Sequence, residues 1–579
     1  MGFPLFMPND NNSLDPVTGL PNAVALAAEL ADGAEEAKRC RGEGDFLLLL
    51  EIYPQARNAE GGMAGIRRAG DFLRSLCGTD TPLYSLGMGI FALIWPVVTP
   101  EDARHMADIL LRRLQREEFV RAHAGLVALG RGGQGGGEEV DEAWQALAVA
   151  RKRGPFGLCV AGGERIFPPP PAGDRARLGR LWRGRERFAL LLIRQDQLAL
   201  SNHFSKRVRV ALAAETQVIF LNQREVLIYL DGAGEEEARN WYREFTRRMH
   251  ETGGGTFSAG IALYPCLNFR KSQIPINCRK ALLHAELLGP ESLAVFNGVT
   301  LNISGDAYYN EGDIRRAVTE YRLGLTLEPA SVNLLNSLGV ALIQLKQTRA
   351  ALAAFEKVLE LEPGNFMALC NLGFAHLSAG REDPAIDFFE RALDVDGRSF
   401  DLLLQLGKLY FRRRRYREAV DLLSRCVDDP LIEERRNGDL AAAHRLLGRS
   451  RMAQEQHGPA ITAVQKALTY NPRDTKAMSL LGELYLHNGE GDDIALSLCR
   501  QAVELDGKRS EGWRRLGWVQ WRLGQLDEAL ETLSRCLRLN RRDHLAAAWL
   551  GEIHEQLGRP SRARQMYDKA RRWQAGDRQ

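Results

Sequence analysis

Glycines that recur every 34 residues, apart from two short insertions, dominate the C-terminal half of the sequence. They stand at Gly305, Gly339, Gly373, Gly407, Gly448, Gly482, Gly517 and Gly551. An alanine follows each glycine by twelve residues, or by thirteen in the sixth unit, and a larger residue follows the alanine by four. A fixed period of this length indicates one supersecondary unit copied along the chain, so this half cannot be a single globular core.

The small and large residues of each unit indicate two antiparallel helices that cross closely. The alanines are Ala317, Ala351, Ala385, Ala419, Ala460, Ala495, Ala529 and Ala563, and the larger residues are Tyr321, Phe355, Phe389, Leu423, Val464, Cys499, Leu533 and Tyr567. Glycine and alanine let two helix axes approach, and the larger side chain fills the space beside them. Pro329, Pro363 and Pro472 end the second helix of three units, because proline cannot continue a helix.

This pattern resembles the tetratricopeptide repeat (TPR), with eight units over residues 301–575. The resemblance implies an all-α, right-handed solenoid in which the first helix of each unit lines a groove. Members of this family use the groove to bind peptides or partner domains. The resemblance therefore implies a protein or peptide partner.

In this family the groove residues lie three before, one after and five after each glycine. Over units four to seven, with the adjacent Trp521, this rule selects a basic and aromatic set: Lys408, Arg412, Arg445, Arg449, Arg514, Trp518, Trp521 and Arg522. Arginine binds carboxylates and phosphates through paired hydrogen bonds, so we expect an acidic or phosphorylated peptide. The alternative is that the arginines at 412–415 form a solvated helix end. The Lys and Asn pattern that clamps a C-terminal carboxylate in chaperone-binding members is not reproduced.

The N-terminal half contains two similar series of motifs. The first series has the turn DPVTGLPN at 15–22, an apolar strand at 46–52, a strand–turn–strand at 84–95 and the helix ALAVARKRG at 146–154. The second has an apolar strand at 188–193, a strand–turn–strand at 217–230, the strand FSAGIA at 257–262 and the helix ALLHAE at 281–286. Short apolar runs bounded by turn residues are typical of buried strands.

Both series resemble the GGDEF domain of diguanylate cyclases, over residues 12–165 and 178–298. A proline-rich linker at 166–177 is expected to separate them. The resemblance implies two α/β domains, each with a mixed, mainly antiparallel sheet wrapped by helices, ahead of the all-α array. It also allows the two domains to pair within one chain, or between two chains, as the family's homodimers do.

The family joins two GTP molecules into cyclic di-GMP, with carboxylates that hold two divalent cations. One carboxylate ends the core strand, and an acidic pair lies in the hairpin turn. In the first copy Glu51 ends the strand, but the turn reads Gly87-Met88-Gly89-Ile90-Phe91, which puts Gly89 and Ile90 in the acidic positions. In the second copy Arg194 ends the strand, and Arg224 stands beside the surviving Glu225. The sequence therefore predicts vestigial sites without catalysis, metal or cofactor.

A guanine-nucleotide or cyclic di-GMP sensor is the alternative function. Arg194 and Arg224 would hold a phosphate without a metal, and Asn202 stands about where the family reads guanine. An active cyclase is a third, weaker hypothesis.

The composition favours a cytoplasmic protein without nucleic-acid or membrane partners. Lys and Arg total 77 against 74 Asp and Glu, which leaves no general excess of positive charge for nucleic acid. The nine cysteines form no CxxC pair, and the N-terminus does not read as a signal peptide. Our interpretation is a bacterial-type, non-catalytic signalling or assembly adaptor.

Overall fold

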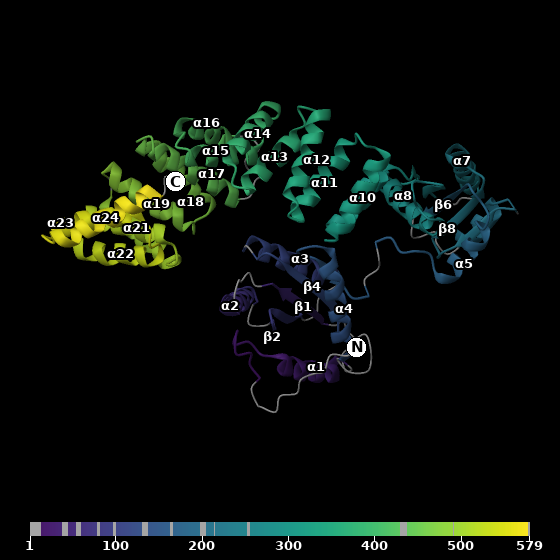
Figure 1. Ribbon diagram of the computed structural model, residues 1–579, viewed down its shortest axis with the longest axis horizontal. Helices are drawn as coiled ribbons and strands as arrows, with labels where there is room; N and C mark the ends of the chain where they lie inside the picture. The colour runs from purple at the N-terminus through teal and green to yellow at the C-terminus, as the bar shows by residue number, and fades with distance from the viewer. Residues whose placement is uncertain are drawn as a thin grey trace. The chain divides into compact units, whose positions relative to one another are not determined.

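The computed structural model describes residues 13–37, 45–53, 59–77, 81–95, 100–117, 119–129, 137–162, 166–196, 204–213, 215–251, 255–428, 437–489 and 491–576. Two five-stranded sheets come first, and paired helices follow them to the end of the described chain (Figure 1).

The first sheet has the strand order β2-β3-β1-β4-β5. Its elements are α1 (Ala23–Ala37), β1 (Phe46–Ile52), α2 (Ala59–Leu76), β2 (Leu83–Gly87), β3 (Ile90–Trp95), α3 (Pro100–Arg116), β4 (Ala122–Ala128), α4 (Gly137–Arg153) and β5 (Leu158–Val160). The central strand β1 runs antiparallel to β3 and β4, and β5 joins the edge parallel to β4. The mixed, mainly antiparallel sheet predicted for this half is confirmed.

The second sheet repeats this arrangement with the order β10-β9-β6-β8-β7. Its elements are α5 (Ala172–Leu181), β6 (Phe188–Gln195), α6 (Phe204–Ala211), β7 (Gln217–Phe220), β8 (Glu225–Asp231), α7 (Glu235–Glu251), β9 (Phe257–Tyr264), the 3₁₀ turn η2 (Lys271–Gln273), α8 (Ile274–Leu288) and β10 (Leu293–Val295). Matching strand orders and matching helix positions support an internal duplication. Residues 172–177 of the predicted linker lie within α5.

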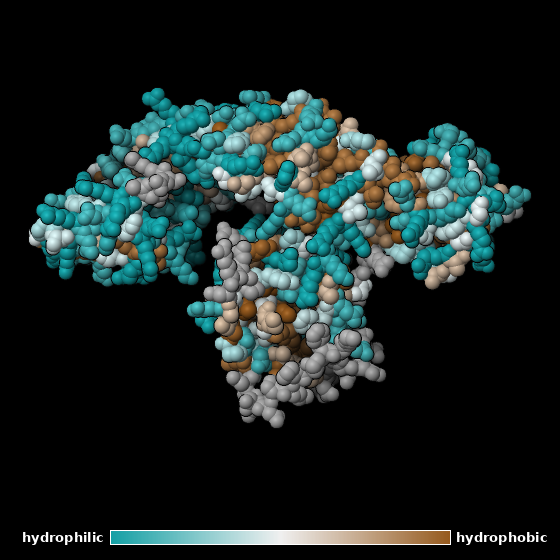
Figure 2. All heavy atoms as spheres, viewed as in Figure 1, coloured by the Kyte–Doolittle hydropathy of each residue, from teal (hydrophilic) through white to brown (hydrophobic). Residues whose placement is uncertain are grey.

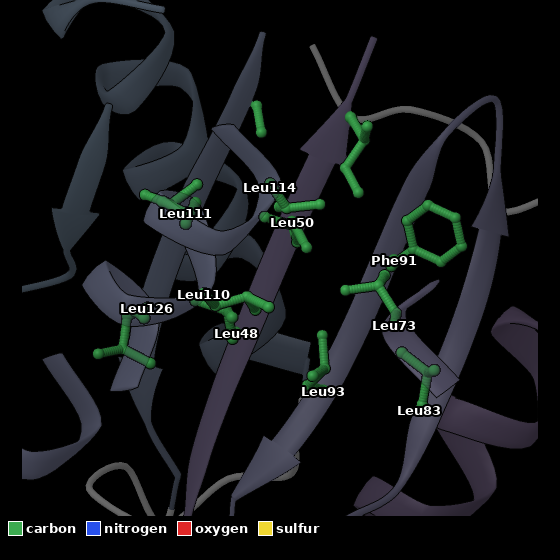
Figure 3. Close-up of a cluster of buried hydrophobic side chains, with 14 of the residues drawn as sticks. Leu48, Leu50, Leu73, Leu83, Phe91, Leu93, Leu110, Leu111, Leu114 and Leu126 are labelled. Carbon is green, nitrogen blue, oxygen red and sulfur yellow. The ribbon is translucent and has the colours of Figure 1, made fainter. Parts of the chain in front are cut away.

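Both central strands are buried on two faces, which explains their uninterrupted apolar runs. In β1, Leu48 and Leu50 face α2 and α3, while Leu47 and Leu49 face α1 and α4. Figure 3 shows the first of these layers, in which leucines of α3 meet those of β1. The second sheet also has two cores, one on α6 and α7 and one on α5 and α8.

One glycine in each sheet lets the last helix of the domain lie directly on a strand. A Cβ atom on Gly125 of β4 would lie 2.4 Å from the carbonyl oxygen of Ala143 in α4. A Cβ atom on Gly260 of β9 would lie 2.2 Å from the carbonyl oxygen of Cys278 in α8. Since no larger residue fits at either distance, the same close helix contact is built twice.

Eight helix pairs make up the C-terminal part. They are α9 (Gly298–Asn310) and α10 (Ile314–Leu327), α11 (Val332–Gln344) and α12 (Thr348–Leu361), α13 (Phe366–Ser378) and α14 (Glu382–Val395), α15 (Phe400–Arg412) and α16 (Tyr416–Val427), α17 (Asn437–Met452) and α18 (His457–Tyr470), α19 (Thr475–Asn488) and α20 (Asp492–Leu505), α21 (Ser510–Arg522) and α22 (Leu526–Leu539), and α23 (His544–Gln556) and α24 (Pro560–Gly576). The chain divides into two compact units within this series, Met1–Pro363 and Gly364–Gln579. The first unit holds both sheets and two helix pairs, and the second holds the other six.

The predicted contact within each unit is present in all eight pairs. A Cβ atom on Gly339 would lie 2.4 Å from the ring of Phe355, and one on Gly407 would lie 2.7 Å from Leu423. Seven of the eight repeat alanines are fully buried, and Ala563 is 3% exposed. The spacing in the sequence therefore reflects a steric requirement between the two helices.

The first helix pair shares a hydrophobic core with the second sheet. Leu301 of α9 belongs to the cluster that contains Leu190 of β6, and Leu323 and Leu327 of α10 pack against that cluster. The repeat therefore begins on the sheet itself. None of the helices in the described ranges is long and apolar enough to cross a bilayer.

Candidate functional site

The end of strand β1 carries Glu51, the single acid predicted at the first vestigial site. Glu51 lies opposite Ile90 in the register, and Arg151 of α4 donates two hydrogen bonds of 2.8 Å to its carboxylate. His123 of β4 lies 3.5 Å away. Burial alone would raise the pKa of Glu51, but hydrogen bonds from Arg151 and Tyr53, together with the charges of Arg151 and His123, outweigh burial and lower that pKa. The carboxylate is already neutralised by a neighbour.

The equivalent position in the second sheet is occupied by Arg194. Arg194 lies opposite Glu225 and donates to it over 2.5 and 2.8 Å, and it also pairs with Glu286 of α8. Arg279 of the same helix reaches Glu225 at 3.2 Å. Burial opposes ionisation of Glu225, but Arg279 and Arg194 together lower its pKa. The surviving acid of the turn is thus held by two guanidinium groups.

The two sheets place this ion pair at matching positions with the charges exchanged. Arg151 follows Gly125 by 26 residues, and Glu286 follows Gly260 by 26 residues. In the first domain the strand supplies the acid and the helix the base, and in the second domain the roles are reversed. Each arrangement stabilises the contact between strand and helix without a metal.

The first hairpin turn has no room for a side chain at Gly89, one of the two positions predicted to be acidic. Met88 and Gly89 form a two-residue turn with φ values of 51° and 81°. These left-handed values favour glycine, and a Cβ atom on Gly89 would lie 2.4 Å from the carbonyl oxygen of Ile52. Gly87 also has a positive φ, of 85°. The backbone of this turn therefore requires glycine at position 89, where the resemblance to GGDEF domains implies an acid.

In the second hairpin turn, Arg224 binds the backbone. Its guanidinium donates to the carbonyl oxygens of Gln195 and Asp196 at 2.7 and 3.1 Å. Asn222 donates to Glu225 at 3.0 Å. Asn202, the predicted guanine contact, lies outside the described residues. The described residues contain no group of three or more His, Cys, Asp or Glu side chains suited to a metal ion.

The remaining candidate site is the face formed by α15, α17, α19, α21 and α23, which we call the first-helix face. Each of these helices contacts the next one in the series. Two predicted arginines of this face connect neighbouring units: Arg445 binds Asp474 at 2.8 Å, and Arg514 binds Asp543 at 3.2 Å. Both acids are N-cap residues, of α19 and α23. These two arginines are thus already paired with the N-cap residues of the following first helices.

The aromatic residues predicted for this face are largely enclosed. Trp518 is 8% exposed, and its ring stacks on His487 at 4.6 Å with Arg522 above it. Trp521 is half-buried, and its ring N–H donates to Gln556. Of these residues, only Arg522 is largely exposed. Arg412 is also exposed and pairs with Glu382 of α14 at 2.8 Å.

Arg449 differs from the other arginines of the face. Its guanidinium lies 4.7 Å from the ring of Phe411 in α15. In the described part of the chain it has neither an ion pair nor a hydrogen bond. Burial, together with nearby arginines that include Arg445, lowers its pKa. Burial also lowers the pKa of Lys408 and of Lys476, which are half-buried on α15 and α19.

The sequence reasoning missed several charged residues of this face. In the sixth unit the same spacing rule selects Ser479, Glu483 and His487, which the basic and aromatic set does not include. Glu483 pairs with the buried Arg515 at 2.7 Å, and Glu511 pairs with it at 3.0 Å. The spacing of the repeat was sufficient to predict that Glu483 lies on this face. Nothing in the spacing pointed to Lys476, Glu511 or Arg515.

Comparison with known proteins identifies the repeat. Tetratricopeptide repeat family models match residues 336–401, 401–430, 445–510 and 514–577. Residues 336–577 therefore contain TPR units, as the spacing predicted, and such units support a role in protein interaction. The two sheet domains lie before these matches, so their resemblance to GGDEF domains stays a prediction.

Similar proteins align over parts of their length. Protein O-mannosyl-transferase TMTC1 of Mus musculus is 31% identical over 102 residues, 17% of this chain and 10% of that protein. Small glutamine-rich tetratricopeptide repeat-containing protein 2 of Mycosarcoma maydis is 28% identical over 125 residues, 21% of this chain and 35% of that protein. This chain thus spans about a tenth and a third of these relatives.

Solved structures with some likeness include pilF of Pseudomonas aeruginosa and YrrB, a TPR protein with an unusual peptide-binding site. The pilF structure is 19% identical, with a TM-score of 0.32, over 39% of this chain and 98% of its own. The YrrB structure is 24% identical, with a TM-score of 0.27, over 33% of this chain and 95% of its own.

Proposed function

We propose that this protein is a non-catalytic adaptor that binds an acidic segment of a protein partner on its first-helix face. The observation that carries the proposal is the series of basic residues on the first helices of TPR units four to seven, several of which, Arg449 among them, have no ion pair within the described residues. TPR units are interaction surfaces, and a charged face selects partners of opposite charge.

The two sheet domains serve as packing modules in this proposal. Their vestigial sites hold compensated ion pairs, Glu51 with Arg151 and Glu225 with Arg194. A divalent cation at either position would have to displace a guanidinium group, and the approach of a second cation is repulsive. The core shared between the second sheet and the first helix pair lets that sheet begin the array.

We expect the purified full chain to capture acidic peptides in preference to basic ones. The measurement is a synthetic array of amidated octapeptides in which four Glu, four Gln or four Lys residues alternate with apolar residues. Capture should be strongest for the Glu series and should weaken as salt rises, because exposed charge pairs are screened. Equal capture of the three series, or none above background, would contradict the proposal.

We also expect no cyclic di-GMP when the full chain is incubated with GTP and Mg²⁺. The physical reason is the pairing of each remaining acid with arginine, which leaves no carboxylate set for two metal ions. The measurement is chromatography of the products against a reaction without protein. Product above that control would show that the domains are catalytic.

The alternative function, a guanine-nucleotide sensor, gains no support from the described residues. Its predicted phosphate contacts, Arg194 and Arg224, are both engaged, one with Glu225 and Glu286 and the other with backbone carbonyls. Calorimetry with GTP and with cyclic di-GMP tests it directly, and heat of binding at micromolar concentration would restore it.

A further inference from the structure

A basic cavity of about 400 Å³ lies where the first sheet domain meets the first two helix pairs of the repeat. All of its lining residues belong to the compact unit Met1–Pro363. None of these described lining residues is acidic, and four of them are arginines: Arg121, Arg151, Arg315 and Arg322. A cavity lined by charges of one sign attracts a ligand of the opposite sign.

Contacts beside the cavity hold its two walls together. Arg104 of α3 pairs at 2.5 Å with Glu311, the C-cap residue of α9. A Cβ atom on Gly154, which follows α4, would lie 3.3 Å from Ile314 of α10. The sheet domain and the repeat therefore touch next to the arginines, and the four guanidinium groups are brought to one place by the packing around them.

The sheet domain supplies two of these arginines, and one of them is already paired. Glu51 accepts two hydrogen bonds of 2.8 Å from Arg151. Arg121, which precedes β4, lies over the ring of Tyr53 at 5.2 Å and has no ion pair in the described residues. The ring limits the motion of the guanidinium without cancelling its charge. Arg121 is thus the cation of this wall that can receive a ligand.

The repeat supplies the other two arginines from one face of α10. Arg315 and Arg322 are seven residues apart, which is about two helical turns, so their side chains share a face. Both are exposed, and neither has an ion pair within the described part of the chain. The charge of Asp313 acts on Arg315, but that carboxylate also pairs with Arg316 at 3.6 Å. Arg322 therefore faces the cavity with no carboxylate bound to it.

The lining favours a compact molecule that carries phosphate. A phosphate group has about 1.5–2 negative charges at neutral pH and three acceptor oxygens, so it can accept hydrogen bonds from both walls at once. The rest of the lining is uncharged, with Val318 and Leu345 among it, and none of the described lining residues is aromatic. Because bases are commonly held by stacking on aromatic rings, this cavity is not arranged for a nucleobase.

We propose that the cavity binds a small phosphate-bearing molecule, which joins Arg121 of the sheet domain to Arg315 and Arg322 of the repeat. Without a ligand, the guanidinium groups that line the cavity repel one another. A bound phosphate replaces this repulsion by attraction and strengthens the attachment of the sheet domain to the array. The site lies on a second helix, away from the first-helix face, so the inference goes beyond the proposed function and does not depend on it.

The test is isothermal titration calorimetry of the full chain with inorganic pyrophosphate, in a phosphate-free buffer of constant ionic strength without divalent cations. Four proteins are compared, namely wild type, Arg121→Gln, Arg322→Gln and Arg316→Gln. Arg316 is the matched control, because it lies on the same helix but does not line the cavity. Citrate and GDP are titrated for comparison, the first as a carboxylate anion and the second as a diphosphate with a base.

Wild type and Arg316→Gln should bind pyrophosphate with equal dissociation constants. Arg121→Gln and Arg322→Gln should each weaken binding about ten- to a hundredfold, since each removes charged hydrogen bonds from one wall. A loss in only one of these two variants would place the anion on one wall alone and overturn the inference. No binding to wild type, citrate as tight as pyrophosphate, or GDP tighter than pyrophosphate would overturn it as well.

Thermal unfolding separates ligand binding from a structural role of the arginines. Without pyrophosphate, Arg121→Gln and Arg322→Gln should melt at the wild-type temperature or above it, because each removes a repulsive charge. With pyrophosphate, the melting temperature of wild type should rise and that of Arg322→Gln should not. A lower melting temperature of both variants without pyrophosphate would show that the arginines stabilise the fold and would contradict the inference.

Discussion

Replacing Glu320 by Leu should lower the free energy of unfolding of the first compact unit, Met1–Pro363, by about 3–5 kcal/mol. The reason is that the variant leaves a buried ammonium group without a counter-ion. Lys280 of α8 binds both carboxylate oxygens of Glu320 in α10, at 2.7 and 2.6 Å. Their side chains are 6% and 10% exposed. Ser304 of α9 donates to the same carboxylate at 2.6 Å. One ion pair therefore ties the last large helix of the second sheet domain to the first helix pair.

The control is the double variant Lys280→Met with Glu320→Leu, which removes both charges. Replacing a buried pair by apolar residues of similar size is close to neutral, so the double variant should recover most of the lost stability. Calorimetric unfolding and hydrogen exchange over residues 274–327 measure the effect. A double variant as unstable as Glu320→Leu would mean that the ion pair is not the cause.

The repeat could be predicted from the sequence because its cause is local and steric. Gly373 and Phe389 are 16 residues apart, and the ring occupies the space that a Cβ atom on the glycine would need. Such a requirement recurs with every unit, so it leaves a visible period. The strands β1 and β6 could also be predicted from their apolar runs, since both faces of each strand are buried.

The candidate site was harder to predict because its long charged side chains pair with residues that are close in space but distant in the sequence. Arg151 and Glu51 are 100 residues apart, and nothing in either motif indicates the pair. The groove rule selected Arg445, Arg449 and Arg514 as equals. The structure distinguishes them only through Asp474 and Asp543, which are N-caps of the following first helices.

The burial of the aromatic residues in the seventh repeat unit could not be predicted for the same reason, because it depends on residues that are distant in the sequence. Trp518 is selected as a groove residue by its position after Gly517. Its exposure depends on the residues of the neighbouring units, and His487 and Trp549 lie against it. Figure 2 shows a mostly hydrophilic visible surface over α14–α24. A spacing rule gives the face of a helix but not what covers it.

Acid should lower the stability of the second compact unit, Gly364–Gln579. The reason is that buried His444 resists protonation in the folded chain and takes up a proton more readily in the unfolded chain. His444 of α17 is 3% exposed and stacks on Tyr470 of α18 at 5.6 Å. Burial, reinforced by Lys466 and Arg451 and opposed by Asp428, lowers the pKa of His444 to about 4. Its Nδ1 atom has no hydrogen-bond partner within the described structure. The neutral ring is therefore the form that the folded protein accepts.

The pH window follows from the two pKa values of His444, about 4 when folded and about 6.5 when unfolded. Above pH 6.5 the ring is neutral in both states, so it adds no pH dependence. Between pH 6.5 and 4 the unfolded chain binds a proton that the folded chain does not, so stability falls as the pH falls. Below pH 4 both states are protonated and the loss levels off. A shift of this size corresponds to about 3 kcal/mol in total.

The comparison of wild type with His444→Phe isolates this contribution, because phenylalanine keeps an aromatic ring beside Tyr470 and cannot titrate. Carboxylates and the other histidines affect both proteins alike, so the difference between their unfolding free energies reports position 444 alone. Urea unfolding followed by circular dichroism at pH 7 and pH 5 should show wild type losing about 2 kcal/mol more than the variant, since about 1.5 units of the window are crossed. Equal losses would mean that His444 remains neutral in the unfolded chain or is solvated in the folded one, and either would contradict its burial.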